Sequence, residues 1–105
     1  MKQYWVYVLL CRDGSFYTGF TSALEQRIAE HHHGAFPDCY TFERRPLNLV
    51  HVSEFQTPTE AIAAEKKLKG WTHAKKHAFV RGDWGELRRL SRGAVRDEGP
   101  STSSG

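Results

Sequence analysis

Glu65 is a charged residue at a position where the surrounding sequence predicts an apolar one. The segment around it has the signals of a helix: Thr57 can cap its start, Pro58 suits its first turn and Gly70 can end it. Projected at about 100° per residue, its apolar side chains form one arc, with Glu65 near the middle. An unpaired carboxylate is costly to bury, so Glu65 requires a basic side chain or a metal ion beside it.

Arg27 and His31 lie four residues apart and therefore share one face of a second predicted helix. This helix should begin at Ser22, where SALE reads as a capping box, and stop before Gly34. His31 projects into the apolar arc of the helix, and Arg27 lies at its edge. A single inward histidine is usually a hydrogen-bonded core residue, whereas an arginine is rarely buried without an anion.

Tyr7 and Tyr17 lie on two predicted strands, YWVYVLLC and FYTGF, joined by RDGS. A two-residue turn would place the tyrosines on opposite faces of the hairpin. A three-residue loop over 12–14, with Gly14 in the left-handed region, places Tyr7 opposite Gly19 and both tyrosines on one face. We favour the longer loop, because it also collects the apolar side chains of both strands on the other face. Gly19 then leaves room beside Tyr7 for a group to approach.

These elements can bring together Tyr7, Tyr17, Arg27, His31 and Glu65. In a structural interpretation, Glu65 pairs with Arg27 and the tyrosines only pack the sheet. In a chemical interpretation, Glu65 binds a hard divalent cation, Arg27 holds a phosphate and Tyr17 accepts a proton. The residue types alone leave both interpretations open.

The rest of the chain supplies one more strand and two more helices. We assign a loop over 34–46, a strand over 47–55, a helix over about 72–81 and a short helix from Asp83 to about Arg92. The order β-β-α-β-α-α, with one more short helix, predicts an α/β (α+β) fold with a small three-stranded, mainly antiparallel sheet flanked by helices. Leu47 and Leu49 should face inward. We expect one domain over 1–92 and a disordered tail over 93–105.

Composition limits the class of protein. The chain has 105 residues, of which 39% are hydrophobic and 12% aromatic, values typical of a globular domain rather than a disordered segment. Its longest apolar run, residues 5–11, is too short to span a membrane, and no signal peptide is visible. Cys11 and Cys39 make no disulfide framework, so we expect a cytoplasmic protein.

The basic residues are concentrated in the second half of the chain, between Arg44 and Arg92. They fit a partner that carries phosphates, or simply a solvated surface. Five of them could follow a nucleic-acid backbone with little regard to sequence: Arg44, Arg45, Lys69, Lys75 and Lys76. No segment looks like an element that reads bases.

The pattern WVYVLLCRDGSFYTGFTSALEQRIAEHH resembles the signature of the GIY-YIG nuclease superfamily, which includes the N-terminal incision domain of UvrC. The resemblance is greatest to the small single-domain bacterial members and covers about residues 3–82. In this sequence Trp5-Val6-Tyr7 stands for the first tripeptide and Tyr17-Thr18-Gly19 for the second. The segment YTFERRPLNLV also resembles the small members. Arg27, His31 and Glu65 match the family's arginine, histidine and metal-binding glutamate.

The resemblance implies an endonuclease that uses Mg²⁺, or Mn²⁺, bound by Glu65. Arg27 would stabilise charge on the phosphate, and Tyr17 would take a proton from water, with His31 as the rival base and Tyr7 assisting. DNA is the expected substrate and DNA repair the expected setting, and RNA stays open. Three alternatives remain: a non-catalytic nucleic-acid-binding module, a subunit of a larger nuclease complex, and a metal sensor built on the segment from His31 to Cys39.

Overall fold

The chain divides by its internal contacts into two compact units, Met1–Gly70 and Trp71–Gly105, and each is described by itself. The structure is a computed structural model that describes residues 2–97. The prediction that residues 1–92 form a single nuclease domain stays a prediction. Within residues 2–97, no helix has the length and apolar character that a membrane span requires.

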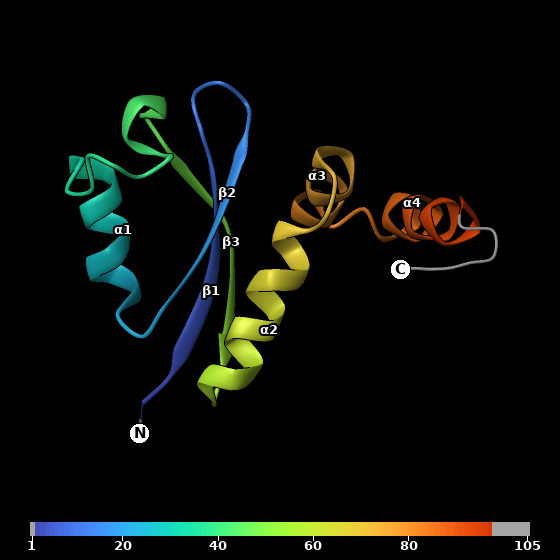
Figure 1. The fold of residues 1–105 in the computed structure, drawn as a ribbon, viewed down its shortest axis with the longest axis horizontal. Helices are drawn as coiled ribbons and strands as arrows, with labels where there is room; N and C mark the ends of the chain where they lie inside the picture. The colour runs from blue at the N-terminus through green and yellow to red at the C-terminus, as the bar shows by residue number, and fades with distance from the viewer. Residues whose placement is uncertain (1, 98–105) are drawn as a thin grey trace. The chain divides into compact units, whose positions relative to one another are not determined.

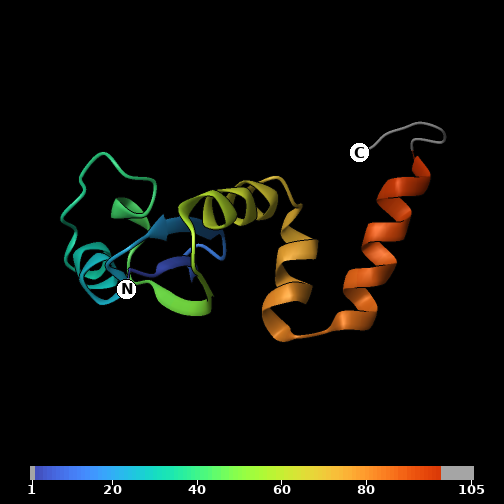
Figure 2. The same cartoon turned by 90° about the horizontal axis from the view of Figure 1, so that it is seen from below.

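The first unit is a three-stranded antiparallel sheet between two helices (Figure 1). Its strands lie in the order β2-β1-β3, so β1 is central. Helices α1 and α2 cover opposite faces of the sheet, as the turned view in Figure 2 also shows. The predicted fold class is confirmed. The elements are β1 (Tyr4–Leu10), β2 (Phe16–Thr21), α1 (Leu24–His33), a short 3₁₀ helix η1 (Phe42–Arg44), β3 (Asn48–Phe55) and α2 (Pro58–Lys69).

The hairpin between β1 and β2 has the predicted longer loop. The Cys11 N–H donates to the Ser15 carbonyl at 2.8 Å, and Gly14 has a positive φ of 87°. Tyr7 therefore lies opposite Gly19 in the sheet. This register puts the ring centroids of Tyr7 and Tyr17 at 6.5 Å from each other, on the face that α1 covers. The preferred register is confirmed.

The third strand differs from the prediction in the side chains that it buries. Leu47 is buried with Tyr7 and Leu9, as expected, but Leu49 is 42% exposed, so its inward placement was wrong. The pairing of β1 with β3 shifts between Val8 and Leu9, where β3 has an irregularity. Such a shift breaks the alternation of faces along the strand, and β3 lies at the edge of the sheet.

The two helices of the first unit begin differently. In α2, the Thr57 hydroxyl accepts a hydrogen bond from the Glu60 N–H at 3.2 Å, which confirms the predicted cap. In α1 the expected SALE capping box was wrong, because the residue at the N-cap is Ala23 and it makes no side-chain cap. The Thr21 hydroxyl instead accepts from the Ala23 N–H at 3.0 Å. Gly34 ends α1 in the left-handed conformation, as predicted.

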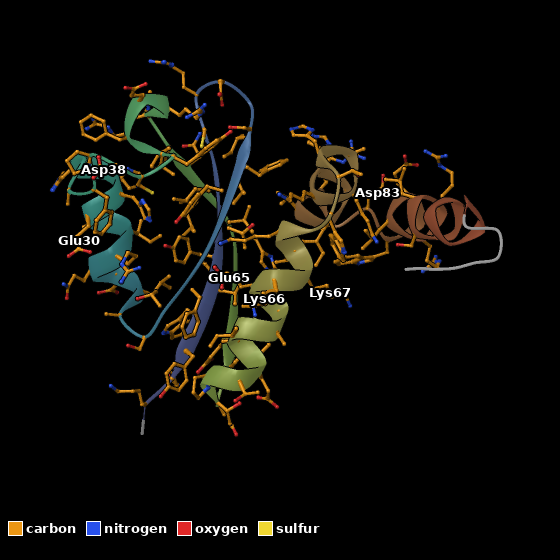
Figure 3. All side chains as sticks on the ribbon, in the orientation of Figure 1. Glu30, Asp38, Glu65, Lys66, Lys67 and Asp83 are labelled. Atoms are coloured by element: carbon orange, nitrogen blue, oxygen red, sulfur yellow. The ribbon has the colours of Figure 1, made fainter. Side chains whose placement is uncertain are left out.

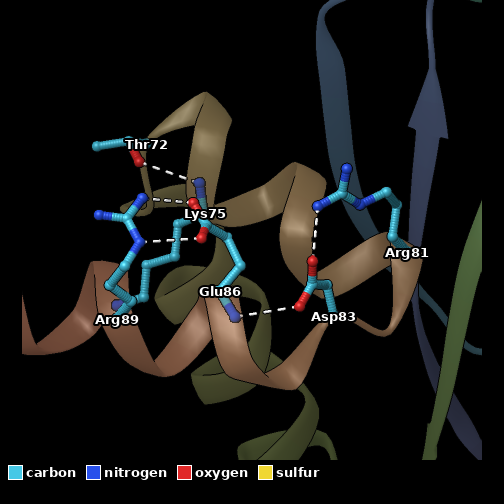
Figure 4. Close-up of polar contacts among 6 residues, drawn as sticks. All are labelled: Thr72, Lys75, Arg81, Asp83, Glu86 and Arg89. Carbon is cyan, nitrogen blue, oxygen red and sulfur yellow. Dashed lines mark hydrogen bonds and ion pairs between the residues drawn. The ribbon is translucent and has the colours of Figure 1, made fainter.

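The second unit contains α3 (His73–Arg81) and α4 (Trp84–Asp97). Figure 4 shows their polar contacts: Thr72 caps α3 by accepting from the Lys75 N–H, and Asp83 accepts from the Glu86 N–H at the start of α4. Helix α4 continues past its expected end to Asp97, so residues 93–97 do not belong to the expected tail. A glycine such as Gly93 weakens a helix but need not end it. Residues 98–105 lie outside the described residues.

Thr18, on β2, carries a buried hydroxyl that has no hydrogen-bond partner among the described residues. The residue is only 2% exposed, so this hydroxyl loses its hydration on folding and gains nothing in return. We expect Thr18→Val, which has nearly the same shape, to raise the free energy of unfolding by about 1 kcal/mol in urea. The matched control is Thr21→Val on the same strand, which removes the acceptor of the Ala23 N–H and should destabilise. A loss of stability in Thr18→Val would contradict the prediction.

Candidate active site

Tyr7 lies over β2 at the position of Gly19. A Cβ atom at residue 19 would be 2.3 Å from both Cζ and Oη of Tyr7, which is closer than side chains approach. Tyr7 itself is 1% exposed, so the ring is enclosed in this position. The predicted open space beside Gly19 is therefore filled by Tyr7. Whether Gly19 also contacts nucleic acid stays a prediction.

His31, on α1, connects Tyr7 to Thr41. Its Nε2 lies 2.9 Å from the Tyr7 hydroxyl and its Nδ1 lies 3.0 Å from the Thr41 hydroxyl. The Thr41 hydroxyl donates to Cys39 Sγ at 3.5 Å, so its oxygen is left to accept the Nδ1–H of His31. That tautomer leaves Nε2 as an acceptor for the Tyr7 O–H. Thr41 was missed from the sequence, although it lies in the segment YTFERRP.

Burial sets the protonation states of this chain of hydrogen bonds. His31 is 3% exposed, and burial together with the charge of Arg27 lowers its pKa, so the imidazole is neutral near neutral pH. Burial raises the pKa of Tyr7 above its ordinary value, although Arg27 acts in the opposite direction. The resting pair is thus a neutral histidine that accepts a hydrogen bond from a neutral tyrosine. Such a pair can take up one proton at His31 Nε2.

Tyr17 lies beside this pair without a hydrogen bond to it among the contacts described. Its ring centroid is 5.3 Å from that of His31 and 6.5 Å from that of Tyr7. Burial raises its pKa far above the ordinary value of a phenol, and its hydrogen bond with Cys39 adds to this. An ionised Tyr17 is therefore unfavourable in this environment.

Arg27 and Glu65 come from helices on opposite faces of the sheet, and each has a local partner. Arg27 Nε lies 3.5 Å from Glu30 Oε1, and Glu65 Oε2 lies 3.0 Å from Lys69 Nζ. These contacts take the place of the Arg27–Glu65 pair considered from the sequence. Glu65 lies on the side of α2 that faces the strands, as Figure 3 shows, and its side chain is 18% exposed. Its charge raises the pKa of Tyr7, so the two groups interact.

The five basic residues predicted to contact nucleic acid are not equivalent. Arg44 Nε forms an ion pair with Asp13 Oδ2 at 3.0 Å. Arg45 lies over the ring of Phe42, and its Nε donates to the backbone carbonyl of Phe42. Lys69 is paired with Glu65 as described above. In the second unit, Lys75 and Lys76 lie on α3, and Lys75 Nζ is 4.5 Å from the centroid of Trp71. A phosphate-binding role for these residues stays a prediction.

Within residues 2–97, no three His, Cys, Asp or Glu side chains are grouped to hold a metal ion together. A site built from protein ligands alone, such as one around His31, His32 and Cys39, therefore has no support in this part of the chain. Glu65 can serve only as a single carboxylate ligand. That donor set fits Mg²⁺, which is commonly held by one or two carboxylates together with water and substrate phosphates.

Comparison with known proteins identifies the family of the chain. A family model described as the GIY-YIG catalytic domain matches residues 3–78, well over half of the sequence. The chain belongs to the GIY-YIG family. Members of this family are generally endonucleases that act with divalent metal ions, so a nuclease-type function and a nucleic-acid substrate follow for the GIY-YIG domain of this chain.

The GIY-YIG relatives of the chain are small proteins of similar length. A UPF0213 protein of Bacillus velezensis is 38% identical over 94 residues, covering 90% of this chain and 89% of the relative. A UPF0213 protein of Enterococcus faecalis is 40% identical over 82 residues, covering 76% of this chain and 92% of the relative. The names of these relatives state no activity.

Two solution NMR structures are similar to the chain. The UPF0213 protein BH0048 of Bacillus halodurans is 35% identical with a TM-score of 0.51, covering 85% of this chain and 97% of that one. The protein EF2693 of E. faecalis is 37% identical with a TM-score of 0.56, covering 78% of this chain and 86% of that one. These likenesses support the GIY-YIG fold.

Proposed function

We propose that the chain is a divalent-metal-dependent endonuclease that hydrolyses phosphodiester bonds in DNA with low sequence specificity. The observation that carries this proposal is the buried chain of hydrogen bonds from Tyr7 through His31 to Thr41, next to Arg27. A buried histidine is often only a hydrogen-bonded core residue, but here the tyrosine that it accepts from is also under the influence of Arg27, a cation that can hold a phosphate. A role in DNA repair belongs to the same proposal.

Tyr7 and His31 act together as the base. In the complex with substrate, a water reaches the Tyr7 oxygen, which is buried in the free protein, and loses a proton to it as the Tyr7 proton passes to His31 Nε2. The water oxygen forms a bond to phosphorus. The bond from phosphorus to the leaving oxygen then breaks, and that oxygen takes up a proton from solvent. The sequence favoured Tyr17 as the base, with His31 as its rival. We prefer the Tyr7–His31 pair, because Tyr7 can pass its proton to His31 and need not ionise. Tyr17 has no hydrogen bond to His31 among the contacts described, and burial makes its ionised form costly.

Arg27 and Glu65 would offset the negative charge of the reacting phosphate, Arg27 directly and Glu65 through a metal ion. The Arg27 side chain is 39% exposed and its ion pair with Glu30 is long, so its guanidinium is available to hold a phosphate. Glu65 would hold Mg²⁺ or Mn²⁺, which when bound supplies positive charge against the negative charge of the reacting phosphate. Lys69 neutralises the same carboxylate, and we expect it to turn towards the nucleic-acid backbone in the complex.

The test is cleavage by the purified chain. Supercoiled plasmid, circular single-stranded DNA and a single-stranded RNA are incubated with Mg²⁺, with Mn²⁺ or with EDTA. We expect cuts within the DNA substrates when either metal is present and none with EDTA. Salt-sensitive binding without cleavage would refute the enzyme and support a non-catalytic binding module.

The pH dependence of the rate distinguishes the two candidate bases. With Tyr7–His31 as the base, the rate rises with pH only while His31 loses its proton, and it levels off by about pH 7, because the pKa of His31 lies below its ordinary value of about 6.5. With Tyr17 as the base, the rate rises about tenfold per pH unit through pH 9, because its pKa is raised.

Single-turnover rates from about pH 5.5 to 9.5 check this prediction. The lowered pKa of His31 means that the unfolded chain binds more protons below about pH 6.5, so stability falls as the pH falls through that range. The folded fraction is therefore measured at each pH by circular dichroism. A steady rise to pH 9 would contradict the assignment of Tyr7–His31.

A further inference from the structure

Three planar groups form a column beside the candidate active site. The rings of Tyr17 and Tyr40 are stacked, with centroids 6.4 Å apart and planes inclined by 15°. The guanidinium carbon of Arg44 lies 3.8 Å from the centroid of Tyr40. At the other end of the column, Tyr17 contacts the ring of His31. The column therefore runs from His31, part of the proposed base, to Arg44, which is partly exposed. All of these residues belong to the first unit.

Two nitrogens on the polar edge of the Arg44 guanidinium already have partners in the protein. Its Nε donates to Asp13 Oδ2 at 3.0 Å, and its Nη1 donates to the Tyr40 carbonyl at 2.9 Å. Asp13 is itself held by the N–H and the hydroxyl of Ser15. The charge of Arg44 is thus balanced by a fixed carboxylate, and the plane of its side chain is fixed over Tyr40. A phosphate would have to compete for this edge.

Part of the Arg44 side chain is open to solvent. One face of the guanidinium is against Tyr40, and Nε and Nη1 are bonded within the protein, yet 36% of the side chain is exposed. Tyr40 is 44% exposed as well. A flat cation supported by an aromatic ring is a surface on which bases stack, because a nucleobase offers a flat, polarisable face of similar size.

We propose that Arg44, backed by Tyr40, is a stacking site for one unpaired nucleobase of the nucleic-acid substrate. This inference rests on the proposed function, and it narrows the substrate to single strands, flaps, loops or frayed ends. In a duplex both faces of a base are covered by its neighbours, so only an unpaired base can occupy the site. The site accepts every base, because every base has a face to stack. In this proposal Arg44 contacts a base, in place of the phosphate contact predicted from the sequence.

The test measures binding in EDTA, so that it does not depend on cleavage. Single strands of about twelve nucleotides carry 2-aminopurine at one position at a time. The fluorescence of this base is quenched when it stacks. We expect wild-type protein to quench it at several positions, because the site accepts every base and the strand can bind in several registers. In Arg44→Lys, which keeps the charge but lacks the flat face, we expect the quenching to be lost. Affinity for the strand should fall about tenfold, with affinity for a blunt duplex unchanged.

Arg88→Lys, the same substitution at an exposed arginine in the second unit, is the matched control and should bind both ligands as wild type does. Equal weakening of strand and duplex binding by Arg44→Lys would overturn the stacking site in favour of a phosphate contact. Absence of quenching at every position with wild-type protein would overturn it without use of a variant. Quenching that is lost in Arg44→Lys, by a protein that cleaves nothing with Mg²⁺, would refute the nuclease and retain the site.

Discussion

Glu65→Gln is expected to reduce cleavage by about a thousandfold or more while the protein remains folded. Glutamine keeps the shape and one oxygen of the side chain but lacks the charge that would hold a divalent cation. The carboxylate is 18% exposed and forms an ion pair with Lys69, which is 53% exposed. The ammonium group of Lys69 therefore stays hydrated when the charge of Glu65 is removed, so we expect the melting temperature to change by only a few degrees.

The matched control is Glu60→Gln, the same substitution five residues earlier at an exposed position of α2. It should cleave as wild type does. Mn²⁺ binding, measured by electron paramagnetic resonance without nucleic acid, should weaken in Glu65→Gln and stay unchanged in Glu60→Gln. Full cleavage by Glu65→Gln would remove Glu65 from the mechanism, and the carboxylate would then be a structural partner of Lys69.

The geometry around Tyr7 could be predicted from the sequence because strand register is a discrete choice. Of the two loops that RDGS allows, only one collects the apolar side chains of both strands on a single face. The hydrophobic effect penalises the other register at several positions at once. The pairing of Tyr7 with Gly19 follows from that choice, and so does the position of Tyr17 on the same face. Periodicity in the same way placed His31 inward, where it is 3% exposed.

The contacts of the loop between α1 and β3 could not be predicted in this way. This segment has no period, so nothing in the sequence indicated that Thr41 would receive the Nδ1–H of His31. Nor did the sequence indicate that Arg44 would be fixed by Asp13, which lies 31 residues away in the chain. Charge patterns show which residues are basic, whereas the structure shows which of them are already neutralised. The stacking role that we propose for Arg44 rests on that difference.

Local signals also gave an incomplete account of Glu65. Its position in the apolar arc was predicted correctly, and its side chain is largely covered. The partner that the sequence suggested was Arg27, but a lysine one turn later in the same helix is nearer in the folded chain. Pairs at i and i+4 need no tertiary arrangement to form, and they are available in any helix with this spacing. Arg27 and Glu65 are on different helices, α1 and α2, so they could pair only if the fold brought their side chains together.

Gly19→Ala is expected to disrupt the site more than any other small substitution. The new Cβ would lie 2.3 Å from Cζ and Oη of Tyr7, and the enclosed ring could escape it only by leaving its pocket. Overpacking of this kind costs about 1–3 kcal/mol, and the hydrogen bond from Tyr7 to His31 would be lost with the movement. We expect unfolding in urea at lower concentration, and a loss of cleavage much larger than the loss of folded protein.

A double-mutant cycle identifies Tyr7 as the cause. In a Tyr7→Leu background the ring is absent, so Gly19→Ala should cost far less stability there than in the wild type. The control is Gly85→Ala in α4, where a Cβ would have only one ordinary contact, with Asp83 at 3.9 Å. Alanine is the better helix former, so this variant should be as stable as wild type or slightly more so. An equal cost of Gly19→Ala in both backgrounds would show that a group other than Tyr7 requires the glycine.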